Sequence, residues 1–263
     1  MKKNVPTNYL INWIGGKRLL RQRISELIPQ NIESYIEPFG GGAWVLFYKE
    51  NWAKLEVYND LDDSLVNLFT IVKYHPEELI KEFKWMFGSR RMFYRAKNWT
   101  TFTDIQRAAK FLFLLTRSFG GKREHFGTAI RGTTSYKSHE NIMLRIEAIS
   151  KRLDKVVIEN FDFEELINKY DYEEAFFYLD PPYTEGVGYA TTSTKDFEHK
   201  KLCECLKKLK GRFLLSYNDS PMVRELYKDF NIIETSRQNG INNCGSGRIY
   251  KELLISNYEG GNS

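Results

Sequence analysis

A run of four apolar residues without alternation, residues 176–179 (FFYL), constrains the fold of this chain more than any other feature. Strands with one wet face alternate apolar and polar side chains, so a continuous run indicates a strand buried on both faces, as in a parallel sheet covered by helices. The tetrapeptide Asp180-Pro181-Pro182-Tyr183 follows directly. Because ligands of open α/β sheets bind beyond the carboxyl ends of the strands, the tetrapeptide lies where a site is expected.

The rest of the pattern predicts further strands around this one and a helical block in the middle of the chain. Periodicity and turn residues predict strands at residues 34–38, 55–58, 156–159, 213–217, 232–235 and 253–256, and helices at residues 17–28, 43–48, 197–209 and 220–227. Between residues 62 and 153 the apolar spacing is helical throughout. We therefore predict an α/β fold whose sheet is built from residues 1–61 and 154–263, with residues 62–153 as a helical insert.

The net charge of +5 is unevenly distributed along the chain. Residues 88–153 hold 14 basic and four acidic residues, so this stretch carries +10 and the remainder −5. A solvated helical face explains such a concentration as well as a polyanionic partner does. A polyanion is favoured by residues 117–127, where cations alternate with aromatic residues and glycines, a pattern that suits phosphate contact and base stacking.

The tetrapeptide carries groups that suit a planar amine. Two prolines lock the turn and remove two N–H donors, which leaves backbone carbonyls able to accept hydrogen bonds. The Asp180 carboxylate and a carbonyl would take the two amine hydrogens while the ring of Tyr183 stacks on its face. The alternative is a rigid strand-ending turn with a surface aspartate.

Two further segments suggest a nucleotide-like ligand. Residues 37–42 (EPFGGG) follow a predicted strand and open a helix, so their backbone can approach a ligand closely. Asp60 lies at the next strand end, where a carboxylate can accept from ribose hydroxyls. Residues 13–17 (WIGGK) put amides and an ammonium near an anionic group. The structural alternatives are a plain tight turn for the glycines and a core position for Trp13. Gly40 and Gly42 match the first two glycines of the dinucleotide-binding fingerprint, but Val45 stands at the third, which argues against a nicotinamide site.

Taken together in this order, these segments resemble the Dam-like family of DNA adenine-N6 methyltransferases, which use S-adenosylmethionine. The resemblance covers most of residues 8–60 and 155–258, including residues 214–219 (LLSYND) and 251–255 (KELLI). It implies a Rossmann-like methyltransferase sheet, with residues 1–61 and 154–263 as the catalytic domain and residues 62–153 as a helical DNA target-recognition domain. Residues 119–134 lack the Arg-Tyr-Asn pattern of a GATC reader, so the target sequence is left open.

The resemblance also implies roles for individual residues. The catalytic residues, which would hold a flipped adenine, are Asp180, Pro181, Pro182 and Tyr183. The residues implied to bind the cofactor are Trp13, Lys17, Glu37, Phe39, Gly40, Gly41, Gly42, Asp60, Phe161, Asp162 and Asp180. The residues that we expect to contact DNA are Arg91, Arg95, Arg117, Lys122, Arg123, His125, Arg131 and Lys137.

Other classes of function are weighed on the same residues. None of the seven prolines is followed by Cys, which excludes a cytosine-C5 methyltransferase. Cytosine-N4 transfer remains an alternative, although that class tends to carry Ser in place of Asp180. A non-catalytic DNA-binding protein on the same fold is a second alternative. Nicotinamide-dependent dehydrogenation stays formally open.

Composition bounds the setting in which the chain works. No apolar stretch approaches the roughly 18 residues that span a bilayer, no export signal follows the basic start, and the three cysteines and four histidines show no zinc-ligand spacing. We therefore expect a cytoplasmic, monomeric protein without a metal. Its expected partner is double-stranded DNA, with a companion restriction endonuclease as a second candidate.

Overall fold

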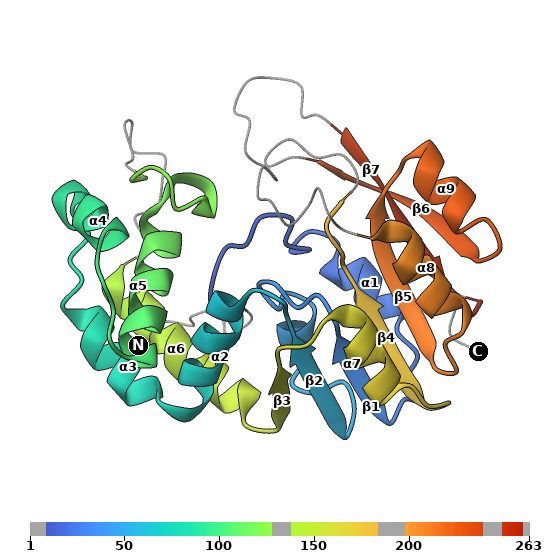
Figure 1. Cartoon of the computed structure of the whole chain (residues 1–263), viewed down its shortest axis with the longest axis horizontal. Coiled ribbons are helices and arrows are strands. Elements are labelled where there is room, and N and C mark those ends of the chain that lie inside the picture. Colours follow the sequence, from blue (N-terminus) through green and yellow to red (C-terminus); the bar gives the residue numbers. More distant parts are fainter. Residues whose placement is uncertain (1–8, 128–137, 184–197, 239–248, 260–263) are drawn as a thin grey trace. The chain divides into compact units, whose positions relative to one another are not determined.

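The strands form one mostly parallel sheet. The computed structural model describes residues 9–127, 138–183, 198–238 and 249–259. The seven strands in these ranges run in the order β3-β2-β1-β4-β5-β7-β6 (Figure 1). Their bounds are β1 Ser34–Glu37, β2 Leu55–Asn59, β3 Val156–Glu159, β4 Ala175–Leu179, β5 Arg212–Asn218, β6 Asn231–Gln238 and β7 Ile249–Ser256. The predicted α/β fold is confirmed.

Strand β4 lies in the middle of this order, and all five of its residues are buried. It pairs in parallel with β1 on one side and with β5 on the other. Strand β7 runs antiparallel to both β5 and β6. A strand with neighbours on both edges and cover on both faces favours apolar side chains, which explains the continuous apolar run in its sequence.

The chain folds into two compact units. The first comprises Met1–Lys17, Gly41–Glu50 and Asp60–Asn160, and the second comprises Arg18–Gly40, Asn51–Asn59 and Phe161–Ser263. Helix α1 (Arg21–Leu27) and the helices α7 Phe163–Tyr170, α8 His199–Lys207 and α9 Pro221–Leu226 belong to the second unit. The catalytic and target-recognition domains expected from the sequence, residues 1–61 with 154–263 and residues 62–153, remain a prediction.

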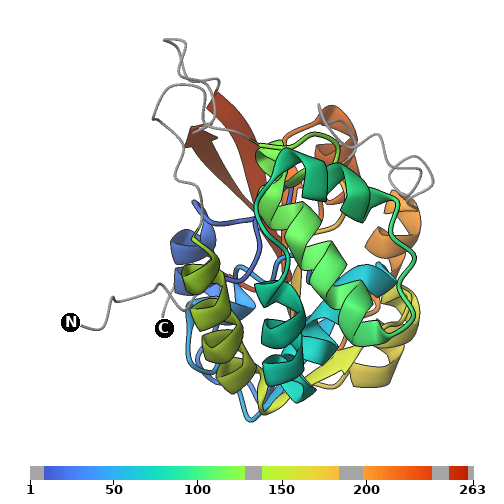
Figure 2. The ribbon, with the colours of Figure 1, turned by 90° about the vertical axis from the view of Figure 1, so that its left-hand side faces the viewer.

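The first unit contains a bundle of helices (Figure 2). Helix α5 packs on α2, α3 and α4, and α6 packs on α2 and α3. Side chains of Asp62, Ser89, Thr103 and Ser138 cap the helices that follow them by accepting a backbone N–H of the first turn. The bounds are α2 Asp63–Tyr74, α3 Pro76–Lys84, α4 Arg90–Lys97, α5 Asp104–Arg117, α6 His139–Leu153, with short 3₁₀ turns η1 at Leu46–Tyr48 and η2 at Phe119–Gly121. The helical character expected of residues 62–153 is confirmed where the structure describes them, in residues 62–127 and 138–153.

Two predicted helices are wrong in extent. Residues 17–28 were expected to be helical throughout, but α1 begins at Arg21, and the ammonium of Lys17 instead donates to the carbonyl of Gly15 at 3.1 Å. Residues 43–48 form only the 3₁₀ turn η1, because Ala43 has a φ of 53°, in the left-handed region that a right-handed helix cannot accommodate. Both errors fall beside the glycines of the candidate site.

Within the ranges that the structure describes, no helix is both long enough and apolar enough to cross a bilayer.

Candidate functional site

The parallel pairing of β4 and β5 positions Asp180 in the second unit. Leu179 is aligned with Leu215, so the residues that follow, Asp180 and Ser216, lie side by side where β4 ends. The Ser216 hydroxyl donates to Asp180 Oδ1 at 3.1 Å and lies 3.1 Å from the hydroxyl of Tyr178. Asp180 itself is partly exposed. Its carboxylate is therefore oriented by Ser216 at this end of the sheet.

Tyr183 is held at the same end of the sheet by its hydroxyl and by its ring. The hydroxyl donates to Glu252 Oε2 at 3.2 Å. The ring centroid lies 5.8 Å from that of Tyr217, with an angle of 31° between the planes. The Tyr217 hydroxyl in turn bonds to Nδ1 of His199 at the start of α8. Burial lowers the pKa of His199, which favours the neutral ring.

This end of the second unit's sheet is rich in carboxylates. Burial, followed by the charges of Asp180, Glu37 and Glu252, raises the pKa of Tyr178 well above its usual value. The Tyr35 hydroxyl donates to Glu37 Oε1 at 2.6 Å, and its pKa is raised by burial and by that carboxylate. Because three carboxylates act on one phenol, the local field favours a cationic or amine-bearing ligand.

A buried amide ties the turn after β1 to the segment before α7, also within the second unit. The Asn59 side chain donates to the carbonyls of Pro38 and Phe161, at 2.9 and 3.0 Å, and accepts from the Phe161 N–H at 2.8 Å. The rings of Phe39 and Phe163 lie 5.7 Å apart. Asp162 is exposed and caps α7 by accepting the Glu164 N–H at 3.0 Å. Asn59 thus brings together two segments that lie far apart in sequence.

In the first unit, Asp60 holds the glycine loop. Its Oδ2 accepts the Gly41 N–H and its Oδ1 accepts the Asp62 N–H, each at 2.8 Å. Burial raises the pKa of Asp60 to about 6, although these two N–H groups act in the opposite direction. Gly41 has a φ of 50°, and a Cβ added there would lie 2.9 Å from the ring of Trp13. A side chain at position 41 would therefore be strained and would strike Trp13, and the loop is held by the carboxylate of Asp60.

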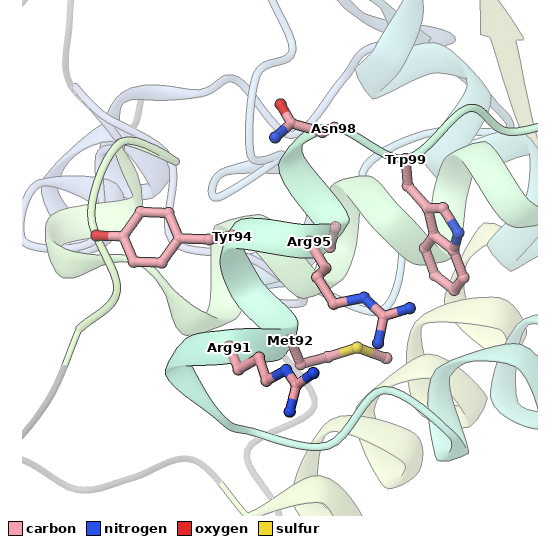
Figure 3. Close-up of a pocket in the computed structure, with 7 residues that line it drawn as sticks. Arg91, Met92, Tyr94, Arg95, Asn98 and Trp99 are labelled. Carbon is pink, nitrogen blue, oxygen red and sulfur yellow. The ribbon is translucent and has the colours of Figure 1, made fainter.

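The residues expected to contact DNA are distributed unevenly. Arg91 and Arg95 are exposed on α4, where they line a surface hollow with Met92, Tyr94, Ala96, Asn98 and Trp99. Figure 3 shows both guanidinium groups and Met92 on the same side of the helix as Trp99, with Tyr94 pointing away. Lys122 and His125 are exposed, and the Arg123 guanidinium lies 5.0 Å from the Phe111 ring. Arg131 and Lys137 lie outside the described residues.

The structure corrects the expected position of Arg117. Its side chain is buried at the end of α5, with 3% of its surface exposed, and Nη2 lies 2.6 Å from Nδ1 of His139. His139 Nε2 lies 3.0 Å from the carbonyl of Phe83, which places the ring between two helices of the bundle. Burial, and then the charge of Arg117, lower the pKa of His139. Arg117 is therefore part of the bundle's interior and does not present its charge at the surface.

Comparison with known proteins identifies the family. Residues 13–241 match the family model described as D12 class N6 adenine-specific DNA methyltransferase. The chain belongs to this family. It is 30% identical to the type II methyltransferase M1.LlaDCHI of Lactococcus lactis subsp. cremoris, over 98% of each chain. It is also 30% identical to the type II methyltransferase M.MjaIII of Methanocaldococcus jannaschii, over 94% of this chain and 98% of that one. Identity to the DNA adenine methylase of Haemophilus influenzae is 24%, over 97% and 95%.

The methyltransferase is thus adenine-specific, as its sequence predicted. The family match does not support the cytosine-N4 reading or the reading as a non-catalytic DNA-binding protein. Among the described residues, no group of three or more His, Cys, Asp and Glu side chains is arranged to hold a metal ion.

Sequence reasoning on this methyltransferase missed four residues around the tetrapeptide: Ser216, Tyr217, Glu252 and His199. A signal for two of them was present. Ser216 is a polar residue within an otherwise apolar strand sequence, and Glu252 directly precedes the apolar residues 253–255. Polar residues at such positions need hydrogen-bond partners when they are buried. The signal for His199 and Tyr217 is spatial only, since 17 residues separate them.

Proposed function

We propose that this methyltransferase uses S-adenosylmethionine to methylate N6 of an adenine that is flipped out of double-stranded DNA. The observation that carries the proposal is the Asp180 carboxylate, oriented by Ser216 in a partly exposed residue after β4, with Tyr183 close by in the chain. An adenine inside a duplex is out of reach of any side chain, so extrusion of the base, at a cost of a few kcal/mol, is required. We further propose that the protein acts in the cytoplasm as a monomer, with a companion restriction endonuclease as a second partner.

The residues present fit this cofactor, whose contribution is an electrophilic methyl group on a sulfonium. In the first unit, the Asp60 carboxylate suits the two ribose hydroxyls, and the loop at Gly41 and Gly42 has no side chain to obstruct a ligand. Trp13 packs on this loop, and Lys17 supplies a cation for a carboxylate. In the second unit, we assign cofactor contacts to Glu37, Phe39, Gly40, Phe161, Asp162 and Asp180. Their carboxylates favour a cationic group.

The tetrapeptide would act on the adenine itself. Asp180 and the Pro181 carbonyl accept the two hydrogens of N6, which localises the nitrogen lone pair that the ring otherwise delocalises. The Tyr183 ring stacks on the base, and Pro182 keeps the turn rigid. N6 would gain the methyl group as the methyl's bond to the sulfonium breaks and a neutral thioether leaves, and N6 would lose one proton to the surrounding water. No bond to the protein would form, so catalysis would consist of positioning and electrostatic stabilisation.

Transfer of radioactive methyl from S-adenosylmethionine to unmethylated DNA tests the proposal directly. Single-molecule sequencing of the product then locates the modified base and defines the recognition sequence. Label that appears in N6-methyladenine supports the proposal. Label in cytosine, or an absence of transfer by folded protein, contradicts it.

Cofactor affinity should depend on pH through Asp60. In the cofactor-free protein this carboxyl has a pKa of about 6, so it is ionised at pH 7 and protonated at pH 5. Since the ionised form accepts the ribose hydroxyls, we expect the Kd for S-adenosylmethionine to be constant above pH 7 and to rise by up to about tenfold per unit below pH 6. Calorimetric titration from pH 5 to pH 8 measures it. Asp60→Asn should bind more weakly with a flat profile, and a flat profile in the unmodified protein would contradict the role of Asp60.

Basic residues of the first unit, such as Lys122 and Arg123, should govern the salt dependence of DNA binding. We expect Lys122→Ala with Arg123→Ala to weaken binding and to reduce the slope of log K against log salt by about one to two units, since each phosphate contact contributes about 0.9. Fluorescence anisotropy with a short duplex over a salt series measures this slope. Lys208→Ala with Lys210→Ala removes the same charge from exposed positions in the second unit and serves as the control. Equal slopes for the two pairs would refute the assignment.

A further inference from the structure

A buried glutamate lies at the end of the sheet that carries the tetrapeptide. Glu252 stands on β7 opposite Asn218, the last residue of β5, and 1% of its surface is exposed. The next three residues of β7, Leu253, Leu254 and Ile255, are fully buried and apolar. Glu252 is thus a buried carboxylate at the start of an apolar run, at a position where packing of the sheet favours an apolar residue.

Such a residue is costly to the fold. A buried carboxylate loses its hydration and must be compensated by hydrogen bonds, and replacement of buried charges by apolar residues is often neutral or stabilising. The stability of the sheet therefore does not account for Glu252. Its contact does: Oε2 accepts the hydroxyl of Tyr183 at 3.2 Å.

This contact determines where the Tyr183 ring lies. The ring packs 5.8 Å from that of Tyr217, and the Tyr217 hydroxyl bonds to His199. Tyr183 is therefore restrained at its hydroxyl by β7 and along its ring by β5, while the residue as a whole stays partly exposed. A ring restrained at two points keeps one orientation before any ligand arrives, and preorganised groups bind without the cost of being ordered.

We propose that Glu252 is a positioning residue for methyl transfer, which acts through Tyr183 by holding its hydroxyl so that the ring is set to stack on the flipped adenine. The inference rests on the proposed function of Tyr183. Glu252 itself touches neither the base nor the cofactor in this account. Its loss should therefore lower kcat and loosen the stacked base, while the affinities for cofactor and for DNA change little.

Three variants separate this role from a general effect on folding. Tyr183→Phe removes the hydroxyl and keeps the ring, Glu252→Ala removes the carboxylate, and Glu252→Gln keeps an acceptor of the same shape. Because both Tyr183→Phe and Glu252→Ala remove a hydrogen bond to a charged group, we expect each to lower kcat by roughly tenfold to a hundredfold. Glu252→Gln should recover most of the activity. The double variant Tyr183→Phe/Glu252→Ala should be no slower than the slower single variant, because both changes remove the same hydrogen bond between Tyr183 and Glu252.

A spectroscopic readout reports on the base directly. A 2-aminopurine placed at the mapped target position fluoresces when it is extruded and is quenched when it stacks on an aromatic ring. Complexes with Tyr183→Phe and with Glu252→Ala should therefore be brighter than the complex with unmodified protein, and Glu252→Gln should resemble the latter. A loss of stability alone does not change this signal in the folded complex.

Glu56 provides the matched control. It is also a buried glutamate of the second unit, on β2, with 4% of its surface exposed. Its Oε1 accepts the Trp52 N–H at 2.9 Å. Glu56→Ala should lower the melting temperature and leave kcat and the 2-aminopurine signal unchanged. Multiplicative losses in the double variant, or an unchanged signal in Glu252→Ala, would overturn the role of Glu252. Failure of the unmodified protein to methylate adenine would instead overturn the proposed function.

Discussion

Replacement of Asp180 by alanine is expected to abolish methyl transfer, with a loss in kcat of about a thousandfold or more, while DNA affinity changes by less than about twofold. Removal of a single group that stabilises the reacting centre has effects of roughly this size in enzymes. The loss follows from position: Asp180 stands directly after the buried strand β4, and its carboxylate is oriented by Ser216 at 3.1 Å. Single-turnover assays with labelled cofactor measure the chemical step.

Three comparisons make this expectation specific. Asp180→Asn keeps the shape but offers one acceptor and an N–H in place of two acceptors, so it should also be severely impaired. Ser216→Ala removes only the group that orients the carboxylate and should be reduced about tenfold. Asp229→Ala removes an exposed aspartate elsewhere in the second unit and should be fully active. Near-normal turnover by Asp180→Ala would contradict the assigned role.

The sequence predicted this end of the sheet because β4 and the residues after it obey local rules. A run of apolar residues, two prolines and a change to polar residues define both a buried strand and its end without reference to the rest of the chain. The other strands were predicted from apolar periodicity and turn residues. Strand β3 was predicted with the bounds that it has in the structure. Other strand ends differ from the predicted ones by one to four residues, most at β6 and β7, whose antiparallel pairing continues to Gln238 and Ile249.

What the sequence could not show depends on residues that are distant in the chain. The left-handed conformation of Ala43 arises within a loop that Asp60 and Trp13 hold in place, and no helix propensity predicts it. Arg117 was expected to contact DNA because it opens residues 117–127, where cations alternate with aromatic residues and glycines, but its guanidinium lies beside Nδ1 of His139, 22 residues later, in the interior of the bundle. Glu252 meets Tyr183 only because β7 runs antiparallel beside β5, a register that periodicity does not specify.

Replacement of Gly40 by alanine is expected to destabilise the protein strongly and to weaken cofactor binding. A Cβ at this position would lie 2.2 Å from Cε2 and 2.5 Å from Cδ2 of Tyr58, whose side chain is fully buried on β2. Neither side can yield easily, because the Gly40 N–H donates to the Asn59 carbonyl at 2.8 Å, next to Tyr58 in the chain. Overpacking of this kind costs about 1–3 kcal/mol, which corresponds to a fall in Tm of roughly 2–12 °C for a chain of this size.

Two variants separate this steric cause from the loss of glycine as such. Gly120 has a φ of 63° but no atom within 4 Å of an added Cβ, so Gly120→Ala introduces backbone strain of about 1–2 kcal/mol without a clash. Tyr58→Leu removes the ring that Gly40→Ala would strike. If the clash is the cause, Gly40→Ala should destabilise Tyr58→Leu far less than it destabilises the unmodified protein, and thermal melts of the four proteins in this cycle measure the difference. Additive effects would mean that the close approach of Gly40 to Tyr58 does not explain why glycine stands at the head of the loop.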